Sequence, residues 1–391
     1  MLPSRNNMIC LASEPRPSAI AGGRGYFFGK GRMREIEIGL LFSQEGSYAL
    51  IGAAGRKGAL RAIDSINADP ALKLLFRPVE RDPKGDIDAY QPLCAEILGE
   101  TSARHLIGST TSWSRKEIIP ALEKAGGVLW YPCPYEGFEA SDHVVYTHAC
   151  PNQHLVPLME WALPRFGKRG YFVGSNYVWG WESNRLARDL LLADGGQVVG
   201  ERYLPIGDTD VYRMIDEVRA TQPDFVLNSL IGPSSYSFLK AIKALHFGVP
   251  ILSCNLTECE LPALGLVAEG LISAGPYFQG STGWPDAKGV TFGSSFEAAA
   301  YMAVRILAAL LSGRPGSETL GLQDLLATPQ AAGFGIDRAT HHLTLPALIA
   351  EVRDGRFEVV ARRDRVQPDP YLSRRATLPA QTRPNLTVVS Q

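Results

Sequence analysis

Side chains that can hydrogen-bond or pack against a small molecule gather in two stretches, residues 107–116 and 129–137, each of which begins in an apolar run. The candidate ligand-binding residues in them are Thr111, Ser112, Tyr131, Cys133 and Pro134. Ligands of open α/β sheets bind at the carboxyl ends of strands, and hydroxyl groups there can donate or accept hydrogen bonds. The two stretches therefore predict one wall of a small-molecule site.

Further polar and aromatic residues follow later apolar runs. Tyr177, Trp179, Leu230 and Glu258 are the candidates there. Tyr177 and Trp179 offer flat apolar faces with polar tips, which suit a small planar polar ligand or the packing of a core. Glu258 is predicted either to cap the next helix or to accept a hydrogen bond from a ligand N–H group.

Ser114 and Glu117 have the spacing of a helix capping box, which predicts a structural role for Ser114. Ser112 would then lie just before the helix, with its hydroxyl free to face a ligand. Pro120 removes a backbone hydrogen bond, and this predicts that the helix starts later than the box indicates.

Catalysis and metal binding find little support in the sequence. Cys133 is the candidate nucleophile, but His143 and His148 show no pattern that identifies a base. The six cysteines are scattered, and His341 and His342 are adjacent, as in a solvated surface pair. We therefore expect no enzyme activity, no catalytic residue, no metal and no cofactor.

The chain has 391 residues and a formal net charge of -1, so no global field favours nucleic acid or an anionic membrane. Residues 1–32 are rich in Pro, Gly, Arg and Ser and lack the apolar core of a signal peptide or membrane span. This predicts a disordered extension and a cytoplasmic protein. Met33 precedes the first strong strand and is an alternative start, in which case the protein could be periplasmic.

Strand and helix patterns alternate along most of the chain, which predicts parallel sheets wrapped by helices. One doubly wound sheet rarely holds this many units, so the fold class is α/β with two doubly wound parallel-sheet lobes. Residues 335–344 and 357–362 alternate apolar and polar residues around the turn Asp354-Gly355, which indicates antiparallel strands.

Several ordered motifs resemble the type I periplasmic-binding-protein family, in particular its amide- and urea-binding branch. They are Gly39–Ser43, Thr111–Lys116, Tyr131–Glu139, Pro151–Gln153, Gly174–Tyr177, Glu182–Asn184 and Gln367–Tyr371. The resemblance implies a ligand cleft between the lobes. It also implies an N-terminal lobe of residues 34–148 plus 276–334 and a C-terminal lobe of 149–275 plus 335–371. The composition of the two ends, with several Arg and Pro residues in each, predicts that residues 1–33 and 372–391 are flexible.

By this resemblance, Ser112, Tyr131 and the position of Cys133 match residues that hold the amide group, and Tyr177 matches a tyrosine of the second lobe. Cys133 stands where the amide sensor has threonine and is a weaker hydrogen-bond partner. Thr110 stands where that sensor has a tyrosine. The ligand choice is expected to differ most at these positions.

The function implied is non-catalytic binding of a small amide or urea-like ligand, as a cytoplasmic sensor. Such a sensor regulates amide or urea metabolism by sequestering an antiterminator protein until the ligand arrives, through lobe closure. The alternative is the substrate-binding component of an ABC transporter for urea, short amides or branched-chain amino acids. The sequence predicts no direct nucleic-acid contact and no membrane insertion, and it leaves a homodimer open.

Overall fold

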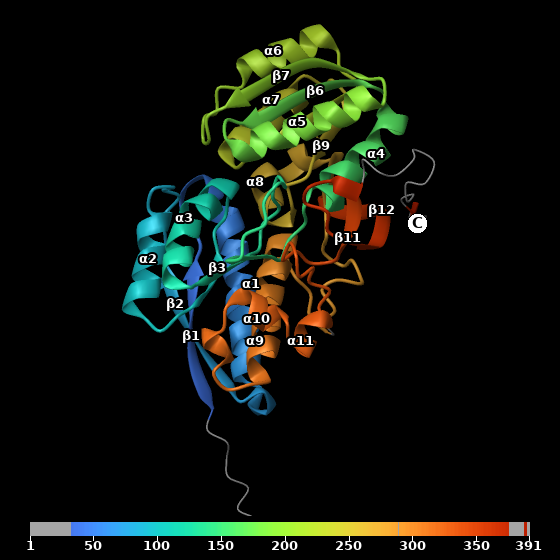
Figure 1. Cartoon of the computed structure of the whole chain (residues 1–391). Helices are drawn as coiled ribbons and strands as arrows, with labels where there is room; N and C mark the ends of the chain where they lie inside the picture. The colour runs from blue at the N-terminus through green and yellow to red at the C-terminus, as the bar shows by residue number, and fades with distance from the viewer. Residues whose placement is uncertain (1–32, 288, 375–386, 389–391) are drawn as a thin grey trace, which may run out of the picture. The chain divides into compact units, whose positions relative to one another are not determined.

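The computed structural model describes residues 33–287, 289–374 and 387–388, which form a two-lobed α/β fold built on two sheets (Figure 1). The predicted fold class is therefore confirmed. The predicted N-terminal extension lies, apart from Met33, outside the described residues, and so does most of the predicted tail.

The first sheet is parallel, with strand order β2-β1-β3-β4-β5. Its strands are β1 (Arg34–Leu41), β2 (Leu74–Arg81), β3 (His105–Gly108), β4 (Val128–Tyr131) and β5 (Val144–Tyr146). These short strands are almost wholly buried from β3 to β5, as expected of a sheet covered on both faces. The apolar runs of the sequence therefore form strands, as predicted.

Helices cover both faces of this sheet (Figure 1). α1 (Ala49–Asn67) and α9 (Ser295–Ser312) pack in one core with Ile36, Ile38 and Leu40. α2 (Tyr90–Glu100) and α3 (Ser112–Ala125) pack in another with Leu41. α9 is the one helix in the described part of the chain long and apolar enough to cross a membrane, and it is mostly buried as a core helix.

The second sheet has the order β13-β12-β11-β10-β9-β8-β6-β7. Its parallel strands are β6 (Arg169–Ser175), β7 (Gln197–Leu204), β8 (Phe225–Ser229), β9 (Ile251–Ser253) and β10 (Leu271–Gly275). One core holds residues of α4 (Leu155–Phe166) and α5 (Val178–Ala193), and the other holds residues of α6 (Tyr212–Thr221) and α7 (Pro233–Ala244). Short helices complete the fold: α8 (Leu261–Leu264), α10 (Leu322–Leu326) and α11 (Pro329–Ala332).

A hairpin extends the second sheet with antiparallel strands, as predicted, but its first strand was misplaced. β11 (Leu345–Arg353) and β12 (Arg356–Val366) pair around Asp354-Gly355. Residues 335–344 form only isolated bridges, because the continuous apolar run that follows them fills the buried position beside β10. β13 (Thr387–Val388) pairs with β12, although the tail was predicted to be unstructured.

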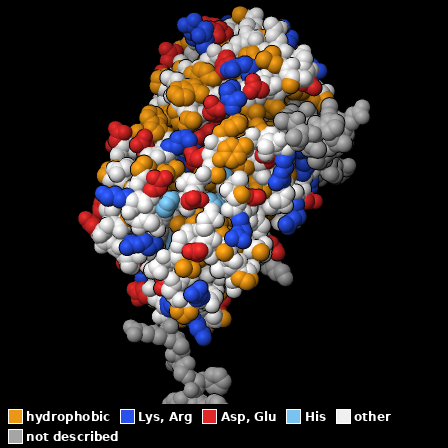
Figure 2. Space-filling model, viewed as in Figure 1, with side chains coloured by type: hydrophobic (Ala, Val, Ile, Leu, Met, Phe, Trp, Pro, Cys, Tyr) orange, Lys and Arg blue, Asp and Glu red, His pale blue; other side chains and the backbone are white. Residues whose placement is uncertain are grey.

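The two lobes follow the two sheets, and the exact lobe boundaries remain a prediction. Positive and negative side chains are interspersed on the face shown in Figure 2, with hydrophobic side chains between them. This mixture agrees with the net charge of -1.

Candidate functional site

The loops that follow β3 and β4 lie side by side. β3 and β4 are parallel neighbours, with Ile107 paired to Trp130, so their carboxyl ends meet at one edge of the sheet. Ser109 to Ser112 follow the first strand, and Cys133 and Pro134 follow the second. All of these residues are buried. The structure thus brings together the two stretches that the sequence selected.

The capping box at the start of α3 is made by Thr111 and Ser114, and the predicted pair Ser114–Glu117 is wrong. Thr111 is the N-cap, its hydroxyl accepts from the Ser114 backbone N–H at 3.1 Å, and the Ser114 hydroxyl accepts from the Thr111 N–H at 3.1 Å. The helix therefore begins at Ser112, three residues earlier than the predicted box would start it, and includes Pro120. The Thr111 hydroxyl is used by this cap.

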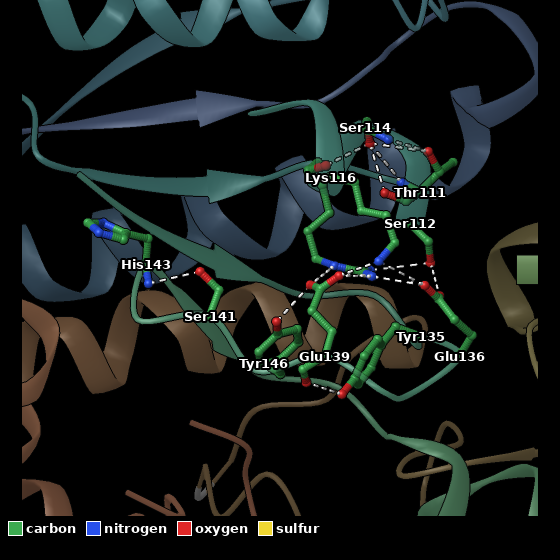
Figure 3. Close-up of polar contacts among 12 residues, drawn as sticks. Thr111, Ser112, Ser114, Lys116, Tyr135, Glu136, Glu139, Ser141, His143 and Tyr146 are labelled. Atoms are coloured by element: carbon green, nitrogen blue, oxygen red, sulfur yellow. Dashed lines mark hydrogen bonds and ion pairs between the residues drawn. The ribbon is translucent and has the colours of Figure 1, made fainter. Parts of the chain in front are cut away.

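Ser112, the first residue of α3, contacts a buried charged cluster (Figure 3). Its hydroxyl donates to Glu136 Oε2 and accepts from Arg115 Nη1 at 3.2 Å. Arg115 Nη2 donates to Glu136 Oε1 at 3.1 Å, and Arg115 Nε donates to Glu139 Oε1 at 2.7 Å. Lys116 Nζ also donates to Glu139, at 2.5 Å. Two carboxylates and two cations thus compensate each other beside Ser112.

The pKa values in this cluster follow from burial and pairing. Burial disfavours the charged form of Arg115, but Glu136 and Glu139 outweigh it and raise the Arg115 pKa well above its usual value. Burial likewise opposes ionisation of Glu139, whereas Arg115 and Lys116 lower the Glu139 pKa to about 2. Arg115 is fully buried. Its positive charge is therefore removed from water and is stabilised by these two carboxylates instead.

Tyr131 and Cys133 lie against the same cluster. The Arg115 guanidinium stands 4.7 Å from the centre of the Tyr131 ring, a cation–π contact. The Tyr131 hydroxyl is buried without a hydrogen-bond partner among the described residues. The Cys133 thiol donates to the Ser109 carbonyl oxygen at 3.6 Å, and burial raises its pKa. A thiol held protonated in this way is a poor nucleophile.

Tyr177 of the second lobe reaches this group. It precedes α5, is buried, and stacks on Trp113 of α3 with ring centres 6.5 Å apart. Burial raises the Tyr177 pKa, with further contributions from Tyr48 and Tyr131. Tyr177 therefore lies beside the start of α3, and its predicted contact with the ligand stays a prediction.

Trp179 and Leu230 lie in the cores of the second lobe. Trp179 packs in the core of α4 and α5, 5.8 Å from the His154 ring, and its buried indole Nε1 has no partner in the described part of the chain. Leu230 packs with α6 and α7, and its carbonyl oxygen accepts from Asn255 Nδ2 at 3.1 Å. Their predicted ligand contacts stay predictions.

Glu258 does not cap a helix: Thr257 and Glu260 form that capping box. Glu258 borders a pocket of about 930 Å³ together with Leu261, Gln279 and Phe357. Its Oε1 accepts from the Gln279 N–H at 2.6 Å, while its Oε2 is buried and has no partner within the described residues. Burial raises the Glu258 pKa to about 7.

Glu258→Gln is expected to stabilise the protein by up to about 3 kcal/mol at pH 8 and by little at pH 4.5. Between pH 4.5 and 7 the unfolded chain has lost the Glu258 proton while the folded chain keeps it, so wild-type stability falls as the pH rises through this window. Glutamine removes that loss. Denaturant unfolding at several pH values measures the difference, with exposed Glu123→Gln as the control. A stability gain that does not vary with pH would contradict the assignment.

The sequence did not indicate several residues of the charged cluster. Arg115, Glu136 and Glu139 lie in the motifs Thr111–Lys116 and Tyr131–Glu139, but nothing in these motifs indicates that they pair. His341 and His342 were predicted on the surface, yet both are buried. The His342 ring stacks on Tyr146 with centres 4.1 Å apart and hydrogen-bonds the Tyr135 hydroxyl at 2.6 Å. Long-range contacts of this kind leave no local spacing signal.

Comparisons with known proteins agree with this architecture. Residues 36–377 match the family model described as periplasmic binding protein domain. A solute-binding protein of an ABC transporter from R. palustris, solved with 4-hydroxybenzoate, superposes with a TM-score of 0.75 at 20% identity, covering 87% of this chain and 100% of that one.

A second solved structure is the branched-chain amino acid transporter substrate-binding protein from Streptococcus pneumoniae in complex with isoleucine. It has a TM-score of 0.72 at 19% identity and covers 86% of this chain and 100% of the other. At such identities the likeness shows the fold, whereas the family match spans most of the chain. The chain belongs to the periplasmic binding protein domain family, a family of binding proteins and not of enzymes.

Proposed function

We propose that this protein is the solute-binding component of an ABC transporter and that its solute is a small uncharged amide or urea-like molecule. The observation that carries the choice of solute is charge compensation. Arg115 and Lys116, the cations beside the Ser112 loop, are already paired with Glu136 and Glu139. A solute carboxylate would find no uncommitted cation in this cluster, so a neutral polar solute fits better.

The polar groups at the site also suit an amide. The Tyr131 hydroxyl is buried without a partner in the described structure, and such a group is costly unless a ligand satisfies it. Ser112, Cys133 and Tyr177 are near enough to Tyr131 to interact with it electrostatically. A planar molecule with one carbonyl and one amino group would satisfy several of these atoms, with the two lobes closing on it.

The similar structures bind other solutes. Hydroxybenzoate and isoleucine, the ligands of the two proteins described above, both carry a carboxylate. In our proposal, this chain does not bind such carboxylates because Arg115 and Lys116 are already paired with Glu136 and Glu139. The predicted site residues Thr111, Pro134, Trp179, Leu230 and Glu258 would line the surroundings of the solute.

The transporter role is favoured over the cytoplasmic sensor predicted from the sequence. The family is named for periplasmic proteins, and both solved structures are transporter receptors. Residues 1–32, on which the cytoplasmic prediction rested, lie outside the described residues. Fractionation of the native host tests this: a periplasmic or membrane-associated protein supports the transporter, and a cytoplasmic protein that co-purifies with an antiterminator supports the sensor.

A thermal-shift screen tests the solute. Urea, formamide, acetamide and butyramide are compared with isoleucine, benzoate and 4-hydroxybenzoate. A ligand present at a hundredfold excess over its Kd stabilises the folded state by about 2.7 kcal/mol. We expect at least one amide or urea to raise the melting temperature. A response to the carboxylates alone would overturn the proposed solute class.

Tyr131→Phe is expected to raise the stability of the solute-free protein by about 1 kcal/mol and to weaken amide binding about tenfold. Phenylalanine removes a buried hydroxyl that has no partner, and with it one hydrogen bond to the solute. Tyr146→Phe is the matched control, because the Tyr146 hydroxyl donates to Glu139 Oε1 at 2.7 Å and its loss should destabilise the protein. Chemical unfolding and calorimetric titration measure both effects. Destabilisation by Tyr131→Phe would show that its hydroxyl is satisfied.

A further inference from the structure

Glu136 is a buried carboxylate wedged between a serine and an arginine. Its side chain is 1% exposed. Oε1 accepts from Arg115 Nη2 at 3.1 Å, and Oε2 accepts from the Ser112 hydroxyl. Figure 3 shows the Glu136 and Ser112 side chains directed toward each other. An arginine-paired carboxylate carries no hydrogen, so Ser112 must be the donor in this bond.

The Ser112 hydroxyl therefore has a fixed polarity. Its single hydrogen is committed to Glu136, and one of its two lone pairs accepts from Arg115 Nη1 at 3.2 Å. One lone pair remains. Ser112 can thus accept a hydrogen bond from a further partner but cannot donate one while Glu136 holds its proton.

Tyr131 supplies the opposite polarity next to it. Its phenolic hydroxyl can donate, and it makes no hydrogen bond of normal geometry to the described residues. Burial raises the Tyr131 pKa well above its usual value, so the phenol keeps its proton. The Ser112 hydroxyl lies near enough to the Tyr131 hydroxyl to interact with it, so a solute that enters between them would meet both groups. An acceptor and a donor thus stand side by side.

We infer that Glu136 is a positioning residue: it makes Ser112 an obligatory acceptor, and so selects solutes that present an N–H group beside a carbonyl oxygen. This rests on the proposed function, since it concerns the same site. A primary amide offers the N–H to Ser112 and the oxygen to Tyr131. A carboxylate of the same shape places an oxygen against the Ser112 lone pair and is rejected.

The probes are acetamide and acetate, which have the same methyl group and differ in carrying an amide or a carboxylate. Calorimetric titration of the full-length protein is expected to give acetamide an affinity at least tenfold above that of acetate. Ser112→Ala should lower the affinity for acetamide about tenfold and leave the affinity for acetate unchanged or higher, because only the amide uses the Ser112 lone pair. Equal weakening of both ligands would mean that Ser112 donates, and would overturn the inference.

Glu136→Gln tests the positioning role directly. A glutamine amide can donate to Ser112, which leaves the serine hydroxyl free to donate to the solute. The ratio of the acetamide affinity to the acetate affinity should therefore fall about tenfold. In the Ser112→Ala background the same change should lower the ratio no more than Glu139→Gln does there, because the specific effect of Glu136 acts through Ser112. A ratio that falls as far in that background as it does with Ser112 present would contradict the role.

Glu139→Gln is the matched control. Glu139 also pairs with Arg115 but makes no hydrogen bond to Ser112 among its contacts with Arg115, Lys116 and Tyr146. This variant removes the same negative charge without changing the polarity of Ser112, so the affinity ratio should fall less in it than in Glu136→Gln. If Glu136→Gln does not fold, the Ser112→Ala result alone still decides the polarity. Wild-type protein that binds no amide would refute the proposed function, whereas amide binding with an unchanged ratio would refute only the role of Glu136.

Discussion

Gly58→Ala is expected to lower the free energy of unfolding by about 3 kcal/mol. A methyl group at Gly58 would lie 2.1 Å from the Glu297 carbonyl oxygen, a distance at which the backbones of α1 and α9 must separate. α9 is the apolar core helix that joins a late segment of the chain to the first sheet. Separation would therefore loosen contacts along the whole helix pair.

Gly99→Ala is the matched control for this effect. Gly99 is also helical, in α2, but a methyl group there would meet nothing within 4 Å. Alanine has the higher helix propensity, so this variant should be stabilised by about 0.5–1 kcal/mol. Denaturant unfolding measures both variants. Similar small changes for the two substitutions would show that α1 and α9 are not in close contact at Gly58.

Local patterns predicted most of the fold because they depend on near neighbours in the chain. The apolar run at residues 36–42 became β1, and the small residues of 51–66 became α1. A small residue such as Gly58 on a helix indicates a close approach, yet nothing in the sequence shows that the partner is α9, some 240 residues later. Periodicity shows that a face is buried but does not identify what covers it.

The candidate site was likewise predictable only where it depends on residues that are close together in the chain. The loops of Ser112 and Tyr131 could be selected from the sequence because each follows an apolar run, and parallel pairing of β3 and β4 brings them together. The capping box was assigned one turn too late, since both Thr111 and Ser114 fit the pattern of a cap. Arg115 and Glu136 are 21 residues apart, and nothing in that spacing indicates an ion pair.

Arg115→Met is expected to lower the free energy of unfolding by about 3–5 kcal/mol near neutral pH. Arg115 is fully buried and pairs with both Glu136 and Glu139. Methionine fills part of its volume but leaves the buried Glu136 and the partly buried Glu139 with Lys116 as the remaining cation, 3.9 Å from Glu136 Oε1. Removing one partner from a buried pair costs far more than the pair contributes, because the remaining charge stays desolvated.

The cost of Arg115→Met should shrink in acid. The Glu139 pKa is lowered in the folded protein from 4.5 to about 2, so its stabilising contribution is present above pH 4.5 and is lost as the pH falls toward 2. In the variant Glu139 can take up a proton at higher pH, which relieves the uncompensated charge. The difference in unfolding free energy between wild type and variant should therefore be largest above pH 5.

Lys116→Met provides the control for Arg115→Met, since Lys116 contacts the same two carboxylates but is 42% exposed. A partly solvated ion pair contributes little, so this variant should lose less than about 1 kcal/mol. Denaturant unfolding of both variants between pH 3 and 8 measures the contrast. Equal, pH-independent losses would mean that the Arg115 cluster is solvated. The polarity assigned to Ser112 depends on Glu136 being held as a buried carboxylate by Arg115.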